Sequence, residues 1–403
     1  MTARHPISDP SGAPPNPPAA PDRRIGHART SRRTVLSFTA AGVAAAAFGS
    51  PLRSARADPG FDASGWIEEQ EDFIISKQVP SGALRGPTQY ELQPYFGNWA
   101  AQGLAAANSS RSREALGNYI QWFLDHMNTA EEDPYGIPGT VSDWVWDPAT
   151  GEETDTGEYS STDAGTTVGM ITAHDAFRTG DRDLQHLVME NIEKYEIMAS
   201  ATTEVKWGVR NPDHLCWARP NSKMKYVQDN AVVYRGLNCL AWLERRAHRM
   251  EQARYYDRKA RQTRSAMLSV LWNEELQNWS WGHGEKLLKV SDLTKAFMPD
   301  QWCQYWQVHL QVVSPDDRRS VASWKAYSDA CPRWMYNEID NNFPHTEMAL
   351  SAVQMGEPEN AATLLETCRE KFSGNGWALP WYHGEAGHSI RAARALIDTG
   401  YAK

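Results

Sequence analysis

Two acidic residues stand where long loops end and predicted helices begin. Asp163 follows Ser161 and Thr162, and Asp229 follows a loop that contains Tyr226. An Asp at a helix start usually caps free N–H groups, but Ser161 and Thr162 can cap this helix themselves. A pair of carboxyl groups with different pKa values can act as general acid and general base. We therefore interpret Asp163 and Asp229 as catalytic candidates.

Two loop segments place acids beside bulky aromatic residues, which suits a group that must keep its proton. Asp143 lies next to Trp144 in a Trp-rich segment, and Glu338 follows Trp334 by four positions. Aromatic surface can desolvate a carboxyl group and raise its pKa, although loop acids are usually solvated. We predict Asp143 and Glu338 as further candidates for the catalytic pair.

Helical periodicity governs the chain from residue 65 to its end, and strand patterns are few. The segment 279–282 is the one stretch in which we expect a short hairpin. The predicted helices lie near 65–78, 91–107, 110–128, 161–179, 182–200, 229–250, 252–273, 300–313, 316–330, 345–356, 358–372 and 384–399.

The connections between these helices alternate between tight turns and long loops. This alternation predicts six antiparallel hairpins, which close into an all-α (α/α)6 toroid that forms one domain over residues 58–403. Each inner helix then begins after a long loop, so the loops gather on one face, where a functional site is expected. An open solenoid stack is the alternative, but no fixed repeat period is visible.

The N-terminal segment, residues 1–57, has the features of an export signal. A proline-rich tail precedes Arg32-Arg33, an Ala-rich apolar stretch and an Ala55-Arg56-Ala57 cleavage site. This order resembles a twin-arginine signal, which predicts that the protein is secreted. A disordered tail with a chance arginine pair is the alternative.

Charge and composition exclude several classes of protein. The 403 residues carry a net charge of −9, and the 33 basic and 48 acidic residues after position 57 give that part −15. Such an acidic, Trp-rich chain, with 17 Trp and 5 Cys, is not typical of a disordered protein, a disulfide scaffold or a nucleic-acid binder. We expect a monomer that has no membrane anchor after cleavage of the signal.

Three stretches of the sequence resemble the six-hairpin glycosidase superfamily, although no single family is identified. They are residues 159–165, 227–237 and 377–390. The resemblance implies an (α/α)6 barrel with acidic catalysts in a cleft at the starts of the inner helices. The tandem Asp-Asp pair of some members is absent, so a catalytic pair must come from separate helices.

Loop aromatics and nearby polar side chains suit the binding of a sugar. Trp faces stack on the apolar faces of sugar rings, and polar groups take up hydroxyl hydrogen bonds, although about half of such Trp residues only cover the core. The predicted substrate-binding residues are Trp144, Trp146, Tyr159, Tyr226, Asn230, Trp217, Trp281, Trp334, Asp340, His345, Trp381 and Glu385.

The sequence therefore predicts a secreted glycoside hydrolase that cleaves a polysaccharide by paired-carboxylate catalysis. The charge of −15 favours a neutral or amino-sugar polymer, and the long loops favour internal cleavage. We predict no cofactor and no metal site, because no Cys or His cluster has metal-ligand spacing. A polysaccharide lyase using Asn230, Tyr226 and His345 and a non-catalytic glycan-binding protein remain alternatives.

Overall fold

The structure is a computed structural model that describes residues 60–403 apart from 87, 89 and 342. The predicted export signal at 1–57 therefore lies outside the described residues. All described residues belong to one compact unit of the chain.

Helices form most of this unit. They are α1 (Ala63–Ser76), α2 (Pro94–Ala107), α3 (Ser110–Asp125), α4 (Asp163–Arg178), α5 (Arg182–Glu190), α6 (Ile192–Thr203), α7 (Val227–Arg246), α8 (Met250–Ala266), α9 (Trp306–His309), α10 (Arg318–Ala330), α11 (Glu347–Gln354), α12 (Pro358–Phe372) and α13 (His383–Asp398).

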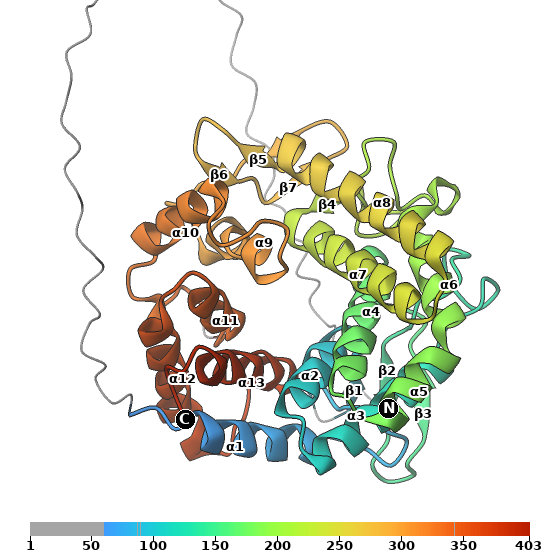
Figure 1. The fold of residues 1–403 in the computed structure, drawn as a ribbon, viewed down its shortest axis with the longest axis horizontal. Helices are drawn as coiled ribbons and strands as arrows, with labels where there is room; N and C mark the ends of the chain where they lie inside the picture. Colours follow the sequence, from blue (N-terminus) through green and yellow to red (C-terminus); the bar gives the residue numbers. More distant parts are fainter. Residues whose placement is uncertain (1–59, 87, 89, 342) are drawn as a thin grey trace, which may run out of the picture. The chain divides into compact units, whose positions relative to one another are not determined.

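The helices are arranged in two concentric layers. Helices α2, α4, α7, α9, α11 and α13 form an inner ring in which each contacts the next and α13 returns to α2 (Figure 1). The remaining helices pack around this ring. The predicted all-α (α/α)6 architecture is confirmed, and each of these six inner helices follows a long loop, as predicted.

The ring is closed by the two ends of the described chain. Helix α1 packs against α13, and the Ser64 backbone N–H donates to the Lys403 carbonyl at 3.1 Å. In the core between the two helices, Trp66 Nε1 donates to Ser389 Oγ at 3.0 Å. The first and last helices thus form the sixth hairpin.

Small residues let the inner helices approach closely where the ring closes. A Cβ atom on Gly103 would lie 2.4 Å from the Gly387 Cα, and one on Gly387 would lie 2.2 Å from the Trp99 carbonyl oxygen. Both neighbours are backbone atoms, so neither can move aside easily. Glycine is therefore required at this crossing of α2 and α13.

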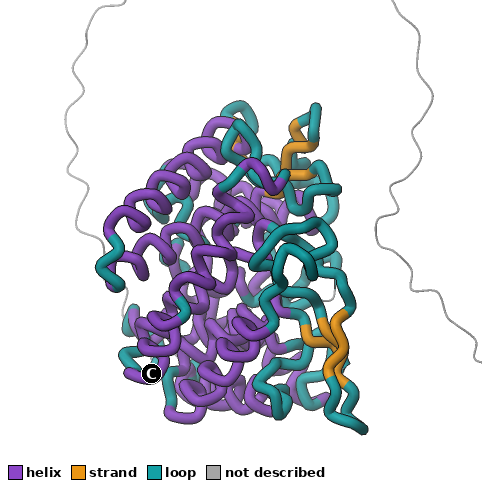
Figure 2. Tube along the Cα trace, turned by 90° about the vertical axis from the view of Figure 1, so that its right-hand side faces the viewer, coloured by secondary structure: helices purple, strands orange, loops and turns teal. Residues whose placement is uncertain are grey.

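The long loops and all the described strands gather at one end of the inner ring (Figure 2). Two three-stranded sheets and one hairpin form there, with the orders β1-β2-β3, β4-β7-β8 and β5-β6. Their strands are β1 (Glu91–Leu92), β2 (Trp144–Trp146), β3 (Glu153–Asp155), β4 (Met224–Tyr226), β5 (Trp272–Asn273), β6 (Asn278–Trp279), β7 (Gly282–Gly284) and β8 (Leu288–Lys289). The segment 279–282, which was expected to belong to a short hairpin, takes part in two of them: Trp279 lies in β6, which pairs with β5, and Gly282 begins β7, which pairs with β8.

Two predicted helices differ from the structure. The helix expected over 182–200 is interrupted at Asn191, which divides it into α5 and α6. The inner helix expected over 300–313 is reduced to α9, preceded by a π turn at Phe297–Gln301 and a short 3-10 turn. Met298 precedes a proline and has an extended ψ of 133°, because a residue before proline avoids the helical region.

All five cysteines are buried and free, as expected for small apolar core residues. Among the described helices, none is both long and apolar enough to cross a membrane.

Candidate active site

Three inner helices carry an acid in their first turn that does not cap its own helix, whereas Asp163 on α4 accepts from the Ala164 backbone N–H at 2.8 Å. Outer helices α1, α3, α5 and α10 begin with a side-chain cap, from Asp62, Ser109, Asp181 and Asp317 respectively. Helices α7, α11 and α13 have no such cap, although each carries an acid in its first turn. The carboxylates of the inner ring are thus available for chemistry at the end where the loops lie.

A cavity of about 330 Å³ opens at this end of the ring. Its walls are mainly aromatic, and they carry two carboxyls, two imidazoles and two tyrosine hydroxyls. The lining residues are Tyr95, Phe96, Trp99, Met298, Trp302, Trp306, Phe343, His345, Glu347, Tyr382, Glu385 and His388. An apolar cavity with a few convergent polar groups is the usual form of a small-molecule site.

Glu347 lies at the start of α11 and is held as a carboxylate by hydrogen bonds. Its Oε1 atom accepts from Trp302 Nε1 at 2.9 Å and from the Tyr305 hydroxyl at 3.0 Å. His345 Nδ1 lies 3.3 Å from the same oxygen. Burial opposes the charged form, but the bond to His345 and the positive charge of that imidazole dominate and lower the pKa of Glu347 to about 2.

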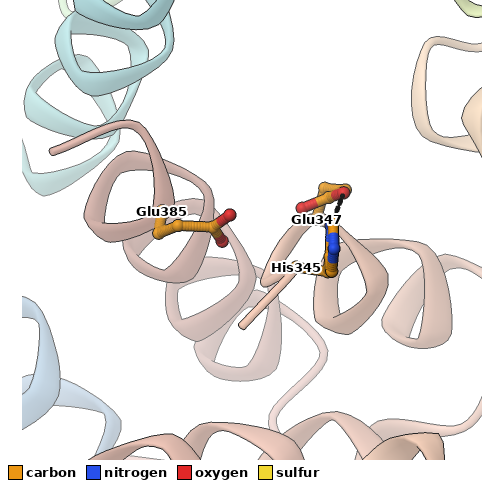
Figure 3. A group of neighbouring side chains, drawn as sticks. All are labelled: His345, Glu347 and Glu385. Carbon is orange, nitrogen blue, oxygen red and sulfur yellow. Dashed lines mark hydrogen bonds and ion pairs between the residues drawn. The ribbon is translucent and has the colours of Figure 1, made fainter. Parts of the chain in front are cut away.

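Glu385 lies in the first turn of α13 and faces Glu347 across the cavity (Figure 3). Its Oε2 atom accepts from the Thr346 backbone N–H at 2.7 Å and from the Thr346 hydroxyl at 2.8 Å. These bonds do not offset burial and the negative charge of Glu347, which raise the pKa of Glu385 to about 7. Near neutral pH this group can hold a proton.

The two glutamates therefore form a pair with opposite protonation preferences. One carboxylate oxygen of each lies within 4.8 Å of the other and of an imidazole nitrogen of His345 (Figure 3). Two titratable groups whose surroundings separate their pKa values are the arrangement that acid–base catalysis needs.

His345 connects this pair to the neighbouring loop. Its backbone φ of 49° is unusual for a residue with a side chain, and Nε2 lies 3.1 Å from Asn341 Oδ1. Burial disfavours the imidazolium, but the bond to Glu347 and its charge outweigh burial and raise the pKa of His345. Strained backbone of this kind is concentrated at functional sites.

Asp163 and Asp229, the main sequence-based candidates, are neighbours on the adjacent helices α4 and α7. Burial raises the pKa of Asp163 to about 7, while burial and the charge of Asp163 raise the pKa of Asp229 well above its usual range. Asp163 Oδ1 accepts from Ser161 Oγ at 2.6 Å, whereas its buried Oδ2 has no partner among the described residues. Neither aspartate lines the 330 Å³ cavity.

Tyr95 links the aspartates to the glutamates. Its side chain lines the cavity, and burial followed by the charges of Asp229, Asp163 and Glu347 raises the pKa of its hydroxyl. All four acids lie in the first turn of an inner helix, at the end of the ring where the loops lie, and the charges of three of them act on the Tyr95 hydroxyl.

The other predicted acids lie apart from the cavity. Asp143 is half-buried beside β2, where burial and the charge of Glu91 raise its pKa to about 7. Glu338 is exposed and ion-paired with Arg333, which lowers the pKa of the glutamate. Asp340 Oδ2 accepts from the Phe297 backbone N–H at 2.8 Å. An exposed, ion-paired carboxylate does not suit a general acid, so Glu338 is not retained as one.

Two predicted sugar-binding tryptophans are core residues. Trp334 is 1% exposed and packs on Trp324 and Tyr327. Trp381 is 2% exposed and its Nε1 atom donates to Gln70 Oε1 at 3.1 Å. The prediction for Trp334 and Trp381 is corrected, because both rings are enclosed by other side chains.

Four predicted tryptophans remain on the loop face. Trp144 and Trp146 lie in β2, where the Arg85 guanidinium is 5.5 Å from the Trp146 ring centroid. Lys223 Nζ lies 3.6 Å from the centroid of the Trp217 ring. Trp281 stacks on Tyr226 with an interplanar angle of 24°. Each of the four is partly accessible, but none lines the 330 Å³ cavity.

The remaining polar candidates hold loops in place. The Tyr159 hydroxyl donates to Asp133 Oδ2 at 2.9 Å. Asn230 is fully buried, accepting from the Cys216 backbone N–H at 2.8 Å and donating to the Tyr226 carbonyl at 2.9 Å. Because its amide is committed to the backbone, Asn230 is corrected from a substrate ligand to a structural residue.

The cavity includes residues that were not among the predicted catalytic or substrate-binding residues, although Glu347 lies early in the fifth predicted inner helix. Glu347 is the most important, and the aromatic lining is formed largely by Tyr95, Trp302, Trp306 and Tyr382. Position in the first turn of an inner helix marks Glu347 as clearly as it marks Glu385, so that signal was present in the sequence. Nothing in the sequence distinguishes Trp306 from a core tryptophan.

His345, Glu347 and Glu385 also form the one group of His, Cys, Asp and Glu side chains, among residues 60–403 as described, that is close enough to ligate a metal ion. Imidazole and carboxylate donors suit zinc or another divalent transition metal. However, Glu347 Oε1 and Glu385 Oε2 already accept hydrogen bonds from protein donors.

Comparison with known proteins identifies the fold of this chain but does not identify its family. No protein-family model matches the sequence, and no curated protein matches it. A solved glycosidase has a TM-score of 0.56 at 12% identity, covering 85% of this chain and 98% of its own. A GH76 alpha-mannanase from Bacteroides thetaiotaomicron has a TM-score of 0.55 at 12% identity, covering 84% of this chain and 97% of its own.

A third solved structure agrees with these two. The GH63 mannosylglycerate hydrolase from Thermus thermophilus, in complex with glucose, has a TM-score of 0.54 at 12% identity, covering 83% of this chain and all of its own. The chain thus has the (α/α)6 fold of the six-hairpin glycosidases, as its resemblance to that superfamily implied.

Proposed function

We propose that this protein is a glycoside hydrolase that uses Glu385 and Glu347 as its catalytic pair. The observation that carries the proposal is the opposite protonation of these two carboxyls at one aromatic-walled cavity, with pKa values of about 7 and about 2. Glycoside cleavage needs one protonated and one ionised carboxyl on either side of the scissile bond. The similarity in fold to solved glycosidases supports the same activity.

In this mechanism Glu385 donates its proton to the glycosidic oxygen as the bond breaks. Glu347 stabilises the developing positive charge on the sugar and acts as nucleophile or general base through Oε2, since Oε1 is held by Trp302 and Tyr305. The aromatic walls stack on the apolar faces of the sugar and exclude water, which strengthens both electrostatic interactions.

Asp163 and Asp229 are proposed to act beside this pair. Their charges act on the Tyr95 hydroxyl, and they share one buried environment in which at most one is ionised readily. We infer that they position Tyr95 and bind hydroxyl groups of a neighbouring sugar unit. Trp217, Tyr226 and Trp281 lie on the same loop face and extend the sugar-binding surface beyond the cavity.

The substrate class follows from charge. The part of the chain after residue 57 carries −15, and four carboxyl groups surround the mouth, so a polyanionic substrate would be repelled. We propose a neutral or amino-sugar polysaccharide, cleaved internally. The twin-arginine signal that we propose at 1–57 implies action outside the cytoplasm, and replacing Arg32 and Arg33 by lysine should then leave the protein in the cell.

The test is reducing-sugar release from a panel of neutral, amino-sugar and uronate-containing polysaccharides. The wild type is compared with Glu385→Gln, Glu347→Gln, Asp229→Asn and Asp163→Asn. Activity lost in the two glutamate variants, with a smaller kcat effect in the aspartate variants, supports the assignment. An unsaturated, ultraviolet-absorbing product would instead show a lyase, and a kcat loss in Asp229→Asn equal to that in Glu385→Gln would move catalysis to the aspartates.

A further inference from the structure

A second cavity lies at the opposite end of the inner ring from the glutamate pair. It has a volume of about 540 Å³ and lies between the C-terminal ends of α2 and α4 and the second half of α13. Its lining residues are Gln102, Ala105, Ala106, Ala107, Asn108, Asp175, Arg178, Thr179, Arg391 and Arg394. Three arginines and one aspartate give this lining a positive charge in a chain that is acidic overall.

Helix C-termini attract cations, so arginines at this end could simply neutralise the helix dipoles. At the C-terminal end of α2 that role is filled by Arg394 and Arg113. Arg394 donates to the Ala106 carbonyl at 3.1 Å, and Arg113 donates to the Asn108 carbonyl at 3.0 Å. These two side chains cap the end of α2.

Arg178 and Arg391 do not donate to a helix carbonyl, although Arg178 lies in the last turn of α4, where its charge favours the helix dipole. Within the described chain, neither forms a hydrogen bond or an ion pair, and the Nη1 atom of Arg391 is buried without a partner. A buried guanidinium N–H that lacks an acceptor is costly, so the position calls for an acceptor from outside the described chain.

Asp175, the one acid in the lining, is hydrogen-bonded to His174 and also lies within electrostatic range of Arg391. Its Oδ1 atom lies 2.8 Å from His174 Nδ1. Burial opposes the charge on His174, but the bond to Asp175 prevails and raises the pKa of that imidazole to about 9. The Arg235 guanidinium adds further positive charge nearby and holds Gln311 Oε1 at 2.6 Å.

A buried amide in the lining offers a contact of a different kind. Gln102 is 1% exposed, and its Oε1 atom has no partner among the described residues, while Nε2 donates to Thr172 Oγ1 at 3.4 Å. An unpartnered amide oxygen can accept a hydrogen bond from a hydroxyl group.

We propose that this second cavity binds a phosphate group, with Arg178 and Arg391 donating to its oxygens. The planar guanidinium fork matches phosphate geometry, and charge-assisted bonds of this kind are the strong ones. The phosphate is either inorganic or carried on a small sugar whose hydroxyl bonds to Gln102. The site does not depend on the proposed hydrolase activity, since it lies at the other end of the barrel.

The experiment is isothermal titration calorimetry of the full chain with inorganic phosphate, glucose 6-phosphate and free glucose, against chloride at equal ionic strength. We expect saturable binding of phosphate that is at least tenfold weaker in Arg178→Gln and undetectable in Arg178→Gln/Arg391→Gln. Arg254→Gln, at an exposed position on the outer helix α8, is the matched control and should bind like the wild type.

Arg178 is exposed, so its single variant should keep the wild-type melting temperature and remain informative if the Arg391 change disturbs α13. Tighter binding of glucose 6-phosphate than of phosphate identifies a sugar phosphate as the ligand, and equal binding identifies the free anion. The proposal is overturned if the wild type binds neither, or if the double variant binds both as well as Arg254→Gln does. Hydrolase assays on the same samples report separately on the glutamate pair.

Discussion

Glu385 on α13 and Glu347 on α11 bring carboxylate oxygens within 4.8 Å of each other, yet their pKa values differ by about five units, from about 7 to about 2. The difference arises from their neighbours. Trp302, Tyr305 and His345 stabilise the charge on Glu347, and that charge then opposes ionisation of Glu385.

Replacing Glu385 by Gln should lower kcat on a polysaccharide by about 10²- to 10⁴-fold, because the leaving oxygen loses its proton donor. The loss should be much smaller on an aryl glycoside, whose leaving group departs without protonation. Glutamine can keep accepting from Thr346, so the fold should be retained. Steady-state kinetics on both substrates make the comparison, with the exposed Glu359→Gln on α12 as control.

Equal losses on the two substrates would mean that Glu385 does not donate the proton. NMR of the anomer that is first released gives an independent test of the catalytic pair. Retention agrees with a close pair of carboxyls, whereas inversion needs a wider gap that holds a water molecule and would bring in Asp229 as the second carboxyl.

The activity should fall as pH rises through about 7, since Glu385 must be protonated and Glu347 is ionised throughout this range. Stability should follow the same direction. The folded-state pKa of Glu385 is raised above its ordinary value of 4.5, so its contribution to stability is complete below about pH 4.5 and is lost as pH rises through 7. Glu385→Gln should reduce the pH dependence of the melting temperature between those values. An unchanged dependence would refute the raised pKa.

Gly387→Ala should destabilise the protein by about 1–3 kcal/mol or more, because the new Cβ would meet the Trp99 carbonyl and the Ala100 Cα atom. Gly165→Ala is the matched control, since α4 leaves open space around that position. It should raise stability by up to about 1 kcal/mol through helix propensity. Urea unfolding measures both, and similar values for the two variants would contradict the close crossing of α2 and α13.

The variants Trp381→Ala and Trp281→Ala should distinguish a tryptophan that packs in the core from one that contacts the sugar. Removing the buried Trp381 should cost about 3–5 kcal/mol of unfolding free energy. Trp281 is half-buried against Tyr226, so its removal should cost less but raise KM for a polysaccharide. Unfolding curves and kinetics on the two variants test this, and a KM effect confined to Trp381→Ala would reverse the assignment.

Treatment with EDTA should leave the hydrolase activity unchanged. His345, Glu347 and Glu385 could ligate a cation, but Glu347 Oε1 and Glu385 Oε2 are held by Trp302, Tyr305 and Thr346, as an acid–base pair requires. Activity is compared before and after chelation and after return of zinc or calcium. Loss that only one metal restores would replace the acid–base pair by a metal-dependent mechanism.

Much of the fold could be predicted from the sequence because it depends on local spacing. Helical periodicity, Asp and Ser caps, and the alternation of short turns with long loops are all properties of neighbouring residues. Together they indicated the inner ring and the face on which the loops lie, and hence that Asp163, Asp229 and Glu385 stand at one mouth. The break at Asn191 and the irregular backbone around Met298 were not predicted, because the helical periodicity of the sequence continues through both places although the helix does not.

The site itself was decided by tertiary packing. By sequence, Glu347 and Glu385 are equivalent first-turn acids, 38 positions apart, and Trp381 and Trp281 are equivalent loop tryptophans. Only the packing of α11 against α13 brings the two carboxyls together and gives one of them three hydrogen-bond donors. A pKa and the exposure of a ring depend on every atom within a few ångströms, and those atoms come from distant parts of the chain.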